Sequence, residues 1–303
     1  MTTLARRPDA LVGTVFRGAD AIRAGLLTKD DLRCRTWRRL FRGIYVDATL
    51  ADSHLHRCLA AGWYLLPAGA AIAGRSAAWL YGVRLISNSD PVEVVTPRPA
   101  RFGPIAGLSI HIGELAHEDV RVVDKVRRTS PLRTCWDLAA WLSLPDAVAY
   151  LDLMVARRLL AVPALTEYAR RRAGIRGWRK LMRAAALVDP AAESAPESRL
   201  RVRLVEAGLP KPVSQYVIEV AGRFVGRVDL AWPSLRVAIE YDGRWHDHPD
   251  QLHADRARLN RLVTTDGWIV LHVTARRLRE DFEGFLAEVR AALRSQRARW
   301  ASV

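Results

Sequence analysis

The order of hydrophobic and polar positions predicts a chain of mixed helices and strands. In some stretches apolar residues recur every three to four positions, which is typical of amphipathic helices. In others they alternate with polar residues, which is typical of strands with one buried face. Helices and strands are interleaved, so the predicted fold class is α/β (α+β). The pattern divides the chain into three predicted domains: residues 1–50, 51–188 and 190–303.

Residues 1–50 are predicted to form a small helical domain with a β-wing. Gly25 is expected to end a first helix, and Thr28 to begin a second one with Asp31 three positions later, as in a capping box. The predicted elements are helices over residues 15–24, from 28 and over 33–41, and a strand over 44–46. This order is typical of a winged helix-turn-helix, a DNA-binding domain. A small helical cap with a solvated basic face fits the same pattern.

The basic stretch RCRTWRRLF at residues 33–41 and the arginine after it supply candidate DNA contacts. Guanidinium groups form forked hydrogen bonds with phosphate. The arginines predicted to contact nucleic acid here are Arg35, Arg38, Arg39 and Arg42.

Residues 51–188 are predicted to mix both element types. Helices are expected over residues 54–66, 74–83 and 130–142, strands over 92–97 and 108–115, and further helices within 146–187. The last of these segments is rich in arginine, which can track a DNA backbone. A solvated helical surface explains the same arginines equally well.

Residues 190–303 are predicted to form an α/β domain with a mixed sheet, reached through a Pro- and Ala-rich linker at 188–196. The predicted order is a helix over residues 197–208, strands over 216–220, 223–232 and 235–243, a helix over 251–267, a strand over 268–274 and a helix over 281–296.

The second and third strands of this domain are predicted to form a hairpin. The only turn signal between them is Pro233-Ser234, and a loop there sets one register. On one face this register pairs Val228 with Tyr241, Leu230 with Ile239, and Trp232 with Val237. On the other face it pairs Ala231 with Ala238, Asp229 with Glu240, and Arg227 with Asp242.

The hairpin therefore sets Asp229 beside Glu240, with Asp242 on the same face. Like charges directly opposite each other destabilise a hairpin, and close carboxylates resist joint ionisation. Arg227 can neutralise Asp242. For the other two, a bound Mg²⁺ or Mn²⁺ would offset the cost, since these ions take one or two carboxylates and complete their shell with water and phosphate. The alternative is that one carboxylate is exposed or bonded to an arginine.

These motifs resemble the PD-(D/E)XK nuclease superfamily, and more closely the bacterial domains related to very-short-patch-repair endonucleases. The likeness covers residues 193–290 and is carried by VDLAWPSLRVAIEYDG, DRARLNRL and GWIVLHVTARRL. It implies a restriction-endonuclease-like domain in which Asp229, Glu240 and Asp242 bind the catalytic metal and Glu197 is an accessory acid. The residues after Lys211 include no lysine.

The superfamily's usual lysine is therefore absent, and the resemblance makes His246 its substitute as a general acid or base. Arg227 and Arg244 flank the carboxylates and are candidate nucleic-acid contacts. Ser194 and Glu197 also read as a capping box, a role that is compatible with the catalytic one.

Residues 5–145 resemble, more loosely, the N-terminal winged-helix region of abortive-infection (AbiE-type) antitoxins, through LTKDDL, RRLFRGIYV, AGRSAAWLYGV and TSPLRTCWDLA. The resemblance implies DNA binding and repression, without catalysis. It supports an alternative function, a transcriptional regulator or antitoxin whose nuclease-like domain is inactive.

Composition favours a nucleic-acid partner and a cytoplasmic location, with association with the nucleoid as a compatible case. The chain has 47 Lys+Arg against 32 Asp+Glu, a formal net charge of +15. Its three cysteines lie far apart, which argues against disulfides and a structural zinc site. The sequence thus predicts a Mg²⁺- or Mn²⁺-dependent DNA endonuclease for repair or defence. An RNA-processing enzyme is a third reading of the same features.

Overall fold

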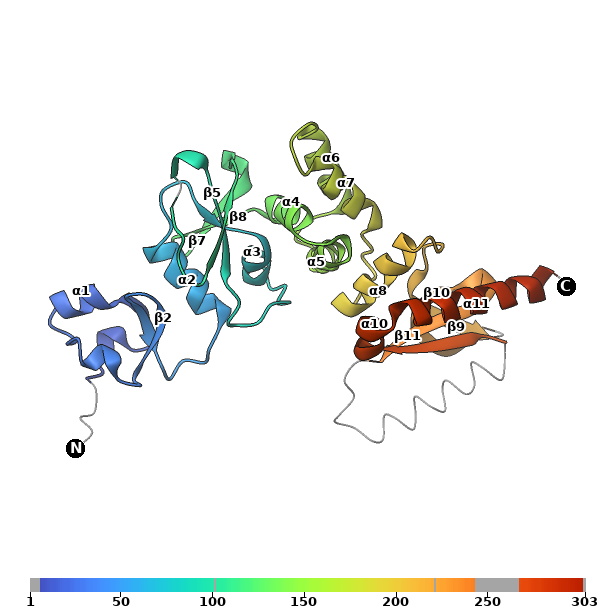
Figure 1. The fold of residues 1–303 in the computed structure, drawn as a ribbon, viewed down its shortest axis with the longest axis horizontal. Helices are drawn as coiled ribbons and strands as arrows, with labels where there is room; N and C mark the ends of the chain where they lie inside the picture. The colour runs from blue at the N-terminus through green and yellow to red at the C-terminus, as the bar shows by residue number, and fades with distance from the viewer. Residues whose placement is uncertain (1–5, 101, 221, 243–266, 302–303) are drawn as a thin grey trace. The chain divides into compact units, whose positions relative to one another are not determined.

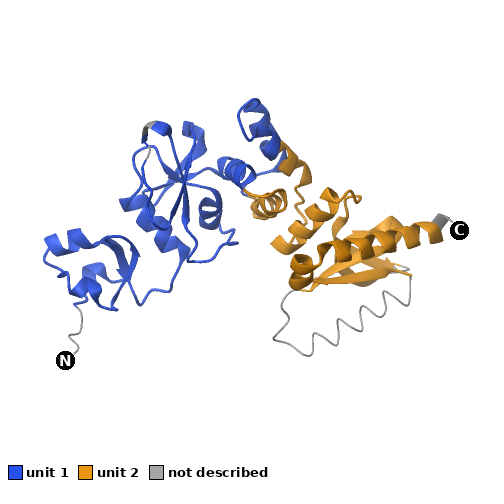
Figure 2. Ribbon diagram, in the orientation of Figure 1, with its two compact units in different colours: residues 1–141, 159–181 blue, residues 142–158, 182–303 orange. Residues whose placement is uncertain are grey.

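The structure is a computed structural model and describes residues 6–100, 102–220, 222–242 and 267–301. The chain divides into two compact units (Figure 2): residues 1–141 with 159–181 form unit 1, and residues 142–158 with 182–303 form unit 2. Each unit combines helices with a mixed sheet, which confirms the predicted α/β (α+β) class. The three predicted domains, residues 1–50, 51–188 and 190–303, do not coincide with these two units. That each of them folds independently stays a prediction.

Unit 1 begins with a three-stranded antiparallel sheet of order β1-β3-β2. Its elements are β1 (Val15–Arg17), α1 (Gly18–Arg23), β2 (Trp37–Phe41) and β3 (Ile44–Asp47). Thr28 and Asp31 form the predicted reciprocal cap, since each backbone N–H donates to the other side chain, at 2.8 and 3.1 Å. The cap introduces only a single 3-10 turn, Asp31–Arg33.

The basic helix predicted over residues 33–41 is wrong, because β2 occupies residues 37–41. β2 and β3 form a hairpin across Arg42 and Gly43, and Gly43 has a φ of 75°. A two-residue turn containing glycine at positive φ favours a hairpin. Trp37 and Leu40 are buried while Arg39 is exposed. The predicted winged helix-turn-helix thereby lacks the helix that would enter a DNA groove.

The rest of unit 1 is built around a five-stranded mixed sheet of order β6-β5-β4-β8-β7 (Figure 1). Its elements are α2 (His54–Tyr64), β4 (Ala71–Ile72), α3 (Gly74–Leu80), β5 (Val92–Thr96), β6 (Leu108–Ile112), β7 (Val120–Val123), β8 (Val126–Thr129) and α4 (Pro131–Trp141). The predicted helices and strands of this region are confirmed, while β4, β7 and β8 were not predicted. Small residues let α2 approach the sheet: Cys58 and Ala61 are fully buried, and a Cβ on Gly62 would lie 2.7 Å from Val126.

The burial of His54 at the start of α2 predicts that unit 1 loses stability in acid. Its ring is fully buried, and Nε2 lies 2.9 Å from the Ser76 hydroxyl. Burial, followed by the charge of Arg57, lowers the pKa of His54 to about 4. A lowered histidine pKa contributes stability above the ordinary value of 6.5, and this stability is lost as pH falls through 4. The shift corresponds to about 3 kcal/mol.

We therefore expect His54→Gln to flatten the loss of thermal stability between pH 7 and pH 5. The exposed His117 provides a control, since His117→Gln should melt like the wild type at both values. Equal pH dependence in wild type and His54→Gln would contradict the assignment.

The arginine-rich segment 146–187 is helical, as predicted. It contains α5 (Leu144–Ala156), α6 (Val162–Arg171) and α7 (Trp178–Leu187). Ser143 caps α5 by accepting the N–H of Asp146 at 3.3 Å. α6 and α7 are joined by a short turn that contains Gly174 and Gly177, both at positive φ.

Unit 2 has a four-stranded sheet of order β12-β11-β10-β9, in which β11 and β12 are parallel. Its further elements are α8 (Ala195–Glu206), β9 (Val213–Val220), β10 (Arg223–Trp232), β11 (Val237–Asp242), β12 (Ile269–Thr274), α10 (Ala275–Glu280) and α11 (Phe282–Ala301). The main core packs α8 and α11 onto one face of this sheet. The predicted mixed sheet is confirmed; the helix predicted over residues 251–267 lies outside the described residues, except for its last position. Among the described helices, none is long and apolar enough to cross a bilayer.

The segment predicted as a linker, residues 188–196, is bound into unit 2. The Asp189 N–H donates to Asp152 at 2.8 Å, and the Ser214 hydroxyl donates to the Asp189 carboxylate at 2.9 Å. Ala192 and Ala195 are buried. Small side chains and proline suggested a flexible connection, but here they allow the chain to pack closely before α8 begins.

Candidate functional site

The hairpin of β10 and β11 has the predicted register. A 3-10 turn, Pro233–Leu235, and Arg236 at a φ of 47° form the loop between the strands. The ladder pairs Trp232 with Val237, Ala231 with Ala238, and Leu230 with Ile239. It ends there, one pair before Asp229 and Glu240. The predicted register is therefore confirmed for these three pairs, and the predicted pairing of Asp229 with Glu240 stays a prediction.

Asp229 occupies the point where the two strands separate. Its Oδ2 accepts the backbone N–H of Tyr241 at 2.8 Å. Its Oδ1 accepts the side-chain amide of Gln215 at 3.2 Å, and the same amide donates to Glu197 Oε2 at 2.8 Å. One amide from β9 therefore joins a carboxylate of β10 to a carboxylate of α8.

Gln215 has a left-handed backbone, with a φ of 53°. This conformation is uncommon for a residue other than glycine and costs about 1–3 kcal/mol. Such strain is retained where the surrounding structure requires it. Here it accompanies the placement of the Gln215 amide between two acids, a position that the sequence pattern does not predict.

The two faces of the sheet differ from the prediction at one residue. Leu230, Trp232 and Ile239 belong to the main core, as expected. Val228, predicted to share their face, instead packs with Ala231 and Ala238 in a second cluster that includes Ile218 and Trp268. The change falls next to Asp229, where the ladder with β11 stops and the side chain accepts the Tyr241 N–H. Trp268 and Tyr216 pack against the two alanines on this face.

Glu197 has the predicted capping role. The Ser194 hydroxyl accepts the Glu197 N–H at 3.4 Å and donates to Glu197 Oε1 at 2.6 Å. Pro196 lies in the first turn, where its missing N–H costs nothing. The cap fixes Glu197 at the start of α8, so its second oxygen is held toward Gln215.

The electrostatics of these two acids oppose ionisation. Burial raises the pKa of Asp229, an effect that the hydrogen bonds from Tyr241 and Gln215 partly reverse. Burial also raises the pKa of Glu197, and the charge of Asp229 raises it further. Within the described part of the chain, neither carboxylate forms an ion pair. A cation bound here would be favoured by both.

Glu240 and Asp242 lie on β11 beside β12. The parallel register places Glu240 next to His272 and Asp242 next to Thr274. The His272 Nδ1 lies 3.2 Å from Asp242 Oδ1. Both side chains are partly exposed, at 38% and 43%. His272 was not predicted as a site residue, although it is the one polar position within the apolar run IVLHV of β12.

The predicted basic residues of the site are placed differently. Arg227, expected to neutralise Asp242, donates both ends of its guanidinium to Glu193, at 2.7 and 3.0 Å. Among the described residues, Arg227 therefore forms its ion pair with Glu193 and not with Asp242. Arg244 and His246 lie outside the described residues.

The predicted DNA contacts near the N-terminus fall into two groups. Arg38 donates to the carbonyl groups of Leu50 and Ala51, at 3.1 and 3.3 Å, so it holds the following loop. Arg35, Arg39 and Arg42 are exposed. Because their helix is absent, any contact with DNA would come from the edge of β2 and its turn.

The donor set fits Mg²⁺ or Mn²⁺ in kind, because carboxylate oxygens are the ligands these ions prefer. Across the described residues, no group of three or more His, Cys, Asp or Glu side chains is arranged to hold a metal ion. Asp229 and Glu240 could supply one or two oxygen ligands.

Comparison with known proteins gives the chain a family but no activity. No protein-family model matches it. "Uncharacterized protein Rv2248" and "Uncharacterized protein MT2308", from two strains of Mycobacterium tuberculosis, are each 31% identical to it over 227 residues, which is 75% of this chain and 81% of theirs. The chain belongs to the family of these mycobacterial proteins.

One solved structure is weakly similar to the chain. The crystal structure of RV2827C protein from Mycobacterium tuberculosis aligns with a TM-score of 0.40 and 17% identity, over 63% of this chain and 76% of that one. A likeness at this level carries no argument about function.

Proposed function

We propose that unit 2 is a restriction-endonuclease-like domain of the PD-(D/E)XK type that hydrolyses phosphodiester bonds of DNA with Mg²⁺ or Mn²⁺. The observation that carries the proposal is the pair Asp229 and Glu197. Both are partly buried, neither forms an ion pair in the described residues, and one strained glutamine joins them. Acids whose ionisation is opposed by burial are enriched at functional sites, which supports a ligand at this pair.

The roles of the acids are proposed from the sequence resemblance, and those of the neighbouring polar residues from their contacts. Asp229 and Glu240 would hold the ion, with Asp242 beside them. A bound divalent ion lowers the pKa of a water molecule and neutralises charge on the phosphate. Glu197 and Gln215 orient Asp229 through the shared amide. His272, 3.2 Å from Asp242, could accept or donate a proton beside that carboxylate. His246 stays a prediction for the same task.

The partner is proposed from charge. A net charge of +15 favours a polyanion, and exposed arginines such as Arg39 and Arg42 are available for phosphate. We expect the log of the DNA association constant to fall against log salt with a slope near −5, about six phosphates neutralised at roughly −0.9 each. Unchanged affinity between 50 and 200 mM salt would exclude duplex DNA as the main partner.

The proposed activity is tested by incubating the full chain with supercoiled plasmid, a mismatched duplex and single-stranded DNA. Parallel reactions contain Mg²⁺, Mn²⁺ or a chelator. The proposal requires nicking that depends on the ion. Cutting in chelator, or none with any ion and substrate, would contradict it.

A second function, a DNA-binding regulator without catalysis, is favoured by one observation. All four carboxylate oxygens of Asp229 and Glu197 already accept hydrogen bonds, from Tyr241, Gln215 and Ser194. A fully satisfied network can serve the fold alone. Tight, salt-sensitive binding of duplex DNA that no ion converts into cutting would support this alternative.

A further inference from the structure

Unit 1 contains a cavity of about 1100 Å³ that the proposed active site does not use. One wall is formed by the end of β6 and by α4, and the other by residues 171–180, which link α6 to α7. The cavity lining includes six cationic side chains, four acidic side chains and three tryptophans. Among them are Arg133, Arg172, Arg176, Arg179, Asp119 and Trp178.

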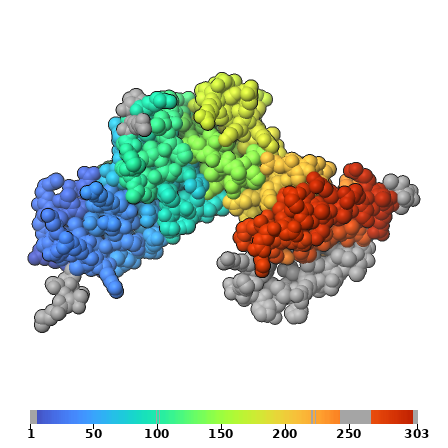
Figure 3. All heavy atoms as spheres, viewed as in Figure 1, coloured from blue at the N-terminus to red at the C-terminus, as the bar shows by residue number. Residues whose placement is uncertain are grey.

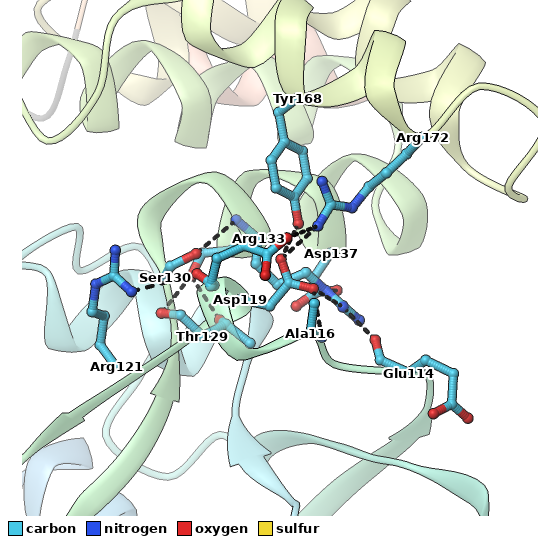
Figure 4. Close-up of polar contacts among 12 residues, drawn as sticks. Glu114, Ala116, Asp119, Arg121, Thr129, Ser130, Arg133, Asp137, Tyr168 and Arg172 are labelled. Carbon is cyan, nitrogen blue, oxygen red and sulfur yellow. Dashed lines mark hydrogen bonds and ion pairs between the residues drawn. The ribbon is translucent and has the colours of Figure 1, made fainter.

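Two of the acids, Asp119 and Asp137, belong to a buried network of hydrogen bonds and ion pairs (Figure 4). Asp119 Oδ1 accepts the Tyr168 hydroxyl at 2.6 Å and the Arg172 guanidinium at 2.8 Å. Its Oδ2 accepts Arg133 at 3.1 Å, and Arg133 also donates to Asp137 at 2.9 Å. This network anchors the C-terminal end of α6 to α4, and Arg176 and Arg179 take no part in it.

The segment 171–180 is held in place by two further contacts. Gly177 has a φ of 109°, and a Cβ on it would lie 3.4 Å from the Trp136 ring. That φ is essentially restricted to glycine. The Lys180 ammonium donates to the Ala140 carbonyl at 2.9 Å. The wall is therefore ordered before any ligand arrives, which lowers the cost of binding.

Cations and apolar surface alternate along this wall. Arg176 and Arg179 are exposed and, in the described residues, form no ion pair. Ile175 beside Arg176 is 55% exposed, and Trp178 is half-buried with the Arg179 guanidinium 5.2 Å from its ring centroid. In the space-filling view the yellow-green segment that contains α6 lies at the surface (Figure 3).

We propose that this cavity binds unpaired nucleotides of a single-stranded nucleic acid, with a base against Trp178 and its phosphates on Arg176 and Arg179. Sequence-tolerant binding of single strands combines these two features, a basic groove and an aromatic platform. A base within a duplex is already stacked and cannot enter. The inference extends the proposed nuclease function by naming the form of the strand, but binding here requires no metal.

The experiment measures the anisotropy of a fluorescein-labelled decathymidylate in chelator, with the full chain. Arg176→Ala/Arg179→Ala should reduce the log–log salt slope by about 1.4, since each single-strand phosphate that is no longer neutralised lowers it by roughly 0.7. Trp178→Ala should weaken binding by about 5- to 150-fold, the usual value of one base stack, while Trp178→Phe should retain most of it. Affinity for a ten-base-pair duplex should change less than affinity for the single strand.

Arg294→Ala/Arg297→Ala, which removes two exposed arginines of α11, is the matched control and should leave single-strand affinity unchanged beyond a small loss from net charge. A ribonucleotide decamer and free thymidine monophosphate compete in separate arms. Competition by the ribonucleotide decamer supports the proposal, whereas competition by the mononucleotide alone overturns it in favour of a nucleotide site. Equal losses in the cavity and control variants also overturn it. Because chelator prevents cutting, these results are independent of whether unit 2 is a nuclease.

Discussion

Asp229→Asn is expected to abolish ion-dependent nicking of supercoiled DNA and to leave DNA affinity nearly unchanged. The carboxylate accepts the Tyr241 N–H through one oxygen, and asparagine can retain that bond through its carbonyl. The NH2 group of asparagine replaces the oxygen that accepts the Gln215 amide, so this amide must turn. The variant therefore keeps the local backbone and loses the charge that would bind the ion. Glu240→Gln should have the same effect. His272→Ala should slow nicking by about 10²–10⁴-fold, the usual value of general acid–base help.

The same substitution should stabilise the protein in chelator. Burial raises the pKa of Asp229. A carboxyl whose pKa is raised by folding lowers the stability of the protein as pH rises above the ordinary pKa of 3.8. Asparagine does not titrate. The gain should therefore be small at pH 4 and reach about 1 kcal/mol at pH 8, similar to the relief of one like-charge pair. Thermal melts at the two pH values measure it.

The exposed Glu280 of α10 supplies the control, since it pairs with Arg276 across one helical turn and is 60% exposed. Glu280→Gln should nick like the wild type and melt within a few tenths of a kcal/mol of it. In the wild type, Mg²⁺ or Mn²⁺ should raise the melting temperature, and in Asp229→Asn it should not. Full nicking by Asp229→Asn would exclude the assigned site even if the protein proved to be a nuclease.

Sequence patterns predicted unit 2 well because its strands are strongly amphipathic. The order of α8, β9, β10, β11 and β12 follows from segments in which hydrophobic and polar residues alternate and from the turn residues between them. The hairpin register follows from the turn at Pro233. The basic stretch before β3 misled the prediction. Arginine at positions 38 and 39 fits a helix face as well as a strand, and only Gly43 indicated the hairpin.

The missed site residues depend on contacts between segments distant in the sequence. Gln215 reaches Glu197 and Asp229 only because its backbone adopts a left-handed conformation, and no local pattern announces that for glutamine. His272 joins Asp242 through a parallel pairing of β11 with β12, across a connection of more than twenty residues. The network of Asp119 likewise joins α4, α6 and the residue before β7. Spacing along the chain does not reveal any of these.

Arg201→Met is expected to destabilise unit 2 by about 3–5 kcal/mol, because it leaves a buried carboxylate uncompensated. Arg201 on α8 donates to Asp152 on α5 at 2.7 Å, and both side chains are fully buried. The same guanidinium donates to the Leu187 carbonyl at 2.6 Å. Burial raises the pKa of Asp152, so the acid relies on the arginine to remain charged. Urea unfolding monitored by tryptophan fluorescence measures the loss.

The pair, rather than the arginine alone, sets the size of this effect. Asp152→Asn retains an acceptor for the Asp189 N–H, so Arg201→Met/Asp152→Asn should recover a large part of the lost stability. The exposed pair of Arg183 and Glu206, 3.0 Å apart, is the control within the same unit, and Arg183→Met should cost no more than about 1 kcal/mol. A double variant as unstable as the sum of the two single ones would show that the two buried charges do not interact. In that case the packing of α5 on α8 would rest on apolar contacts, and the buried ion pair would not contribute to it.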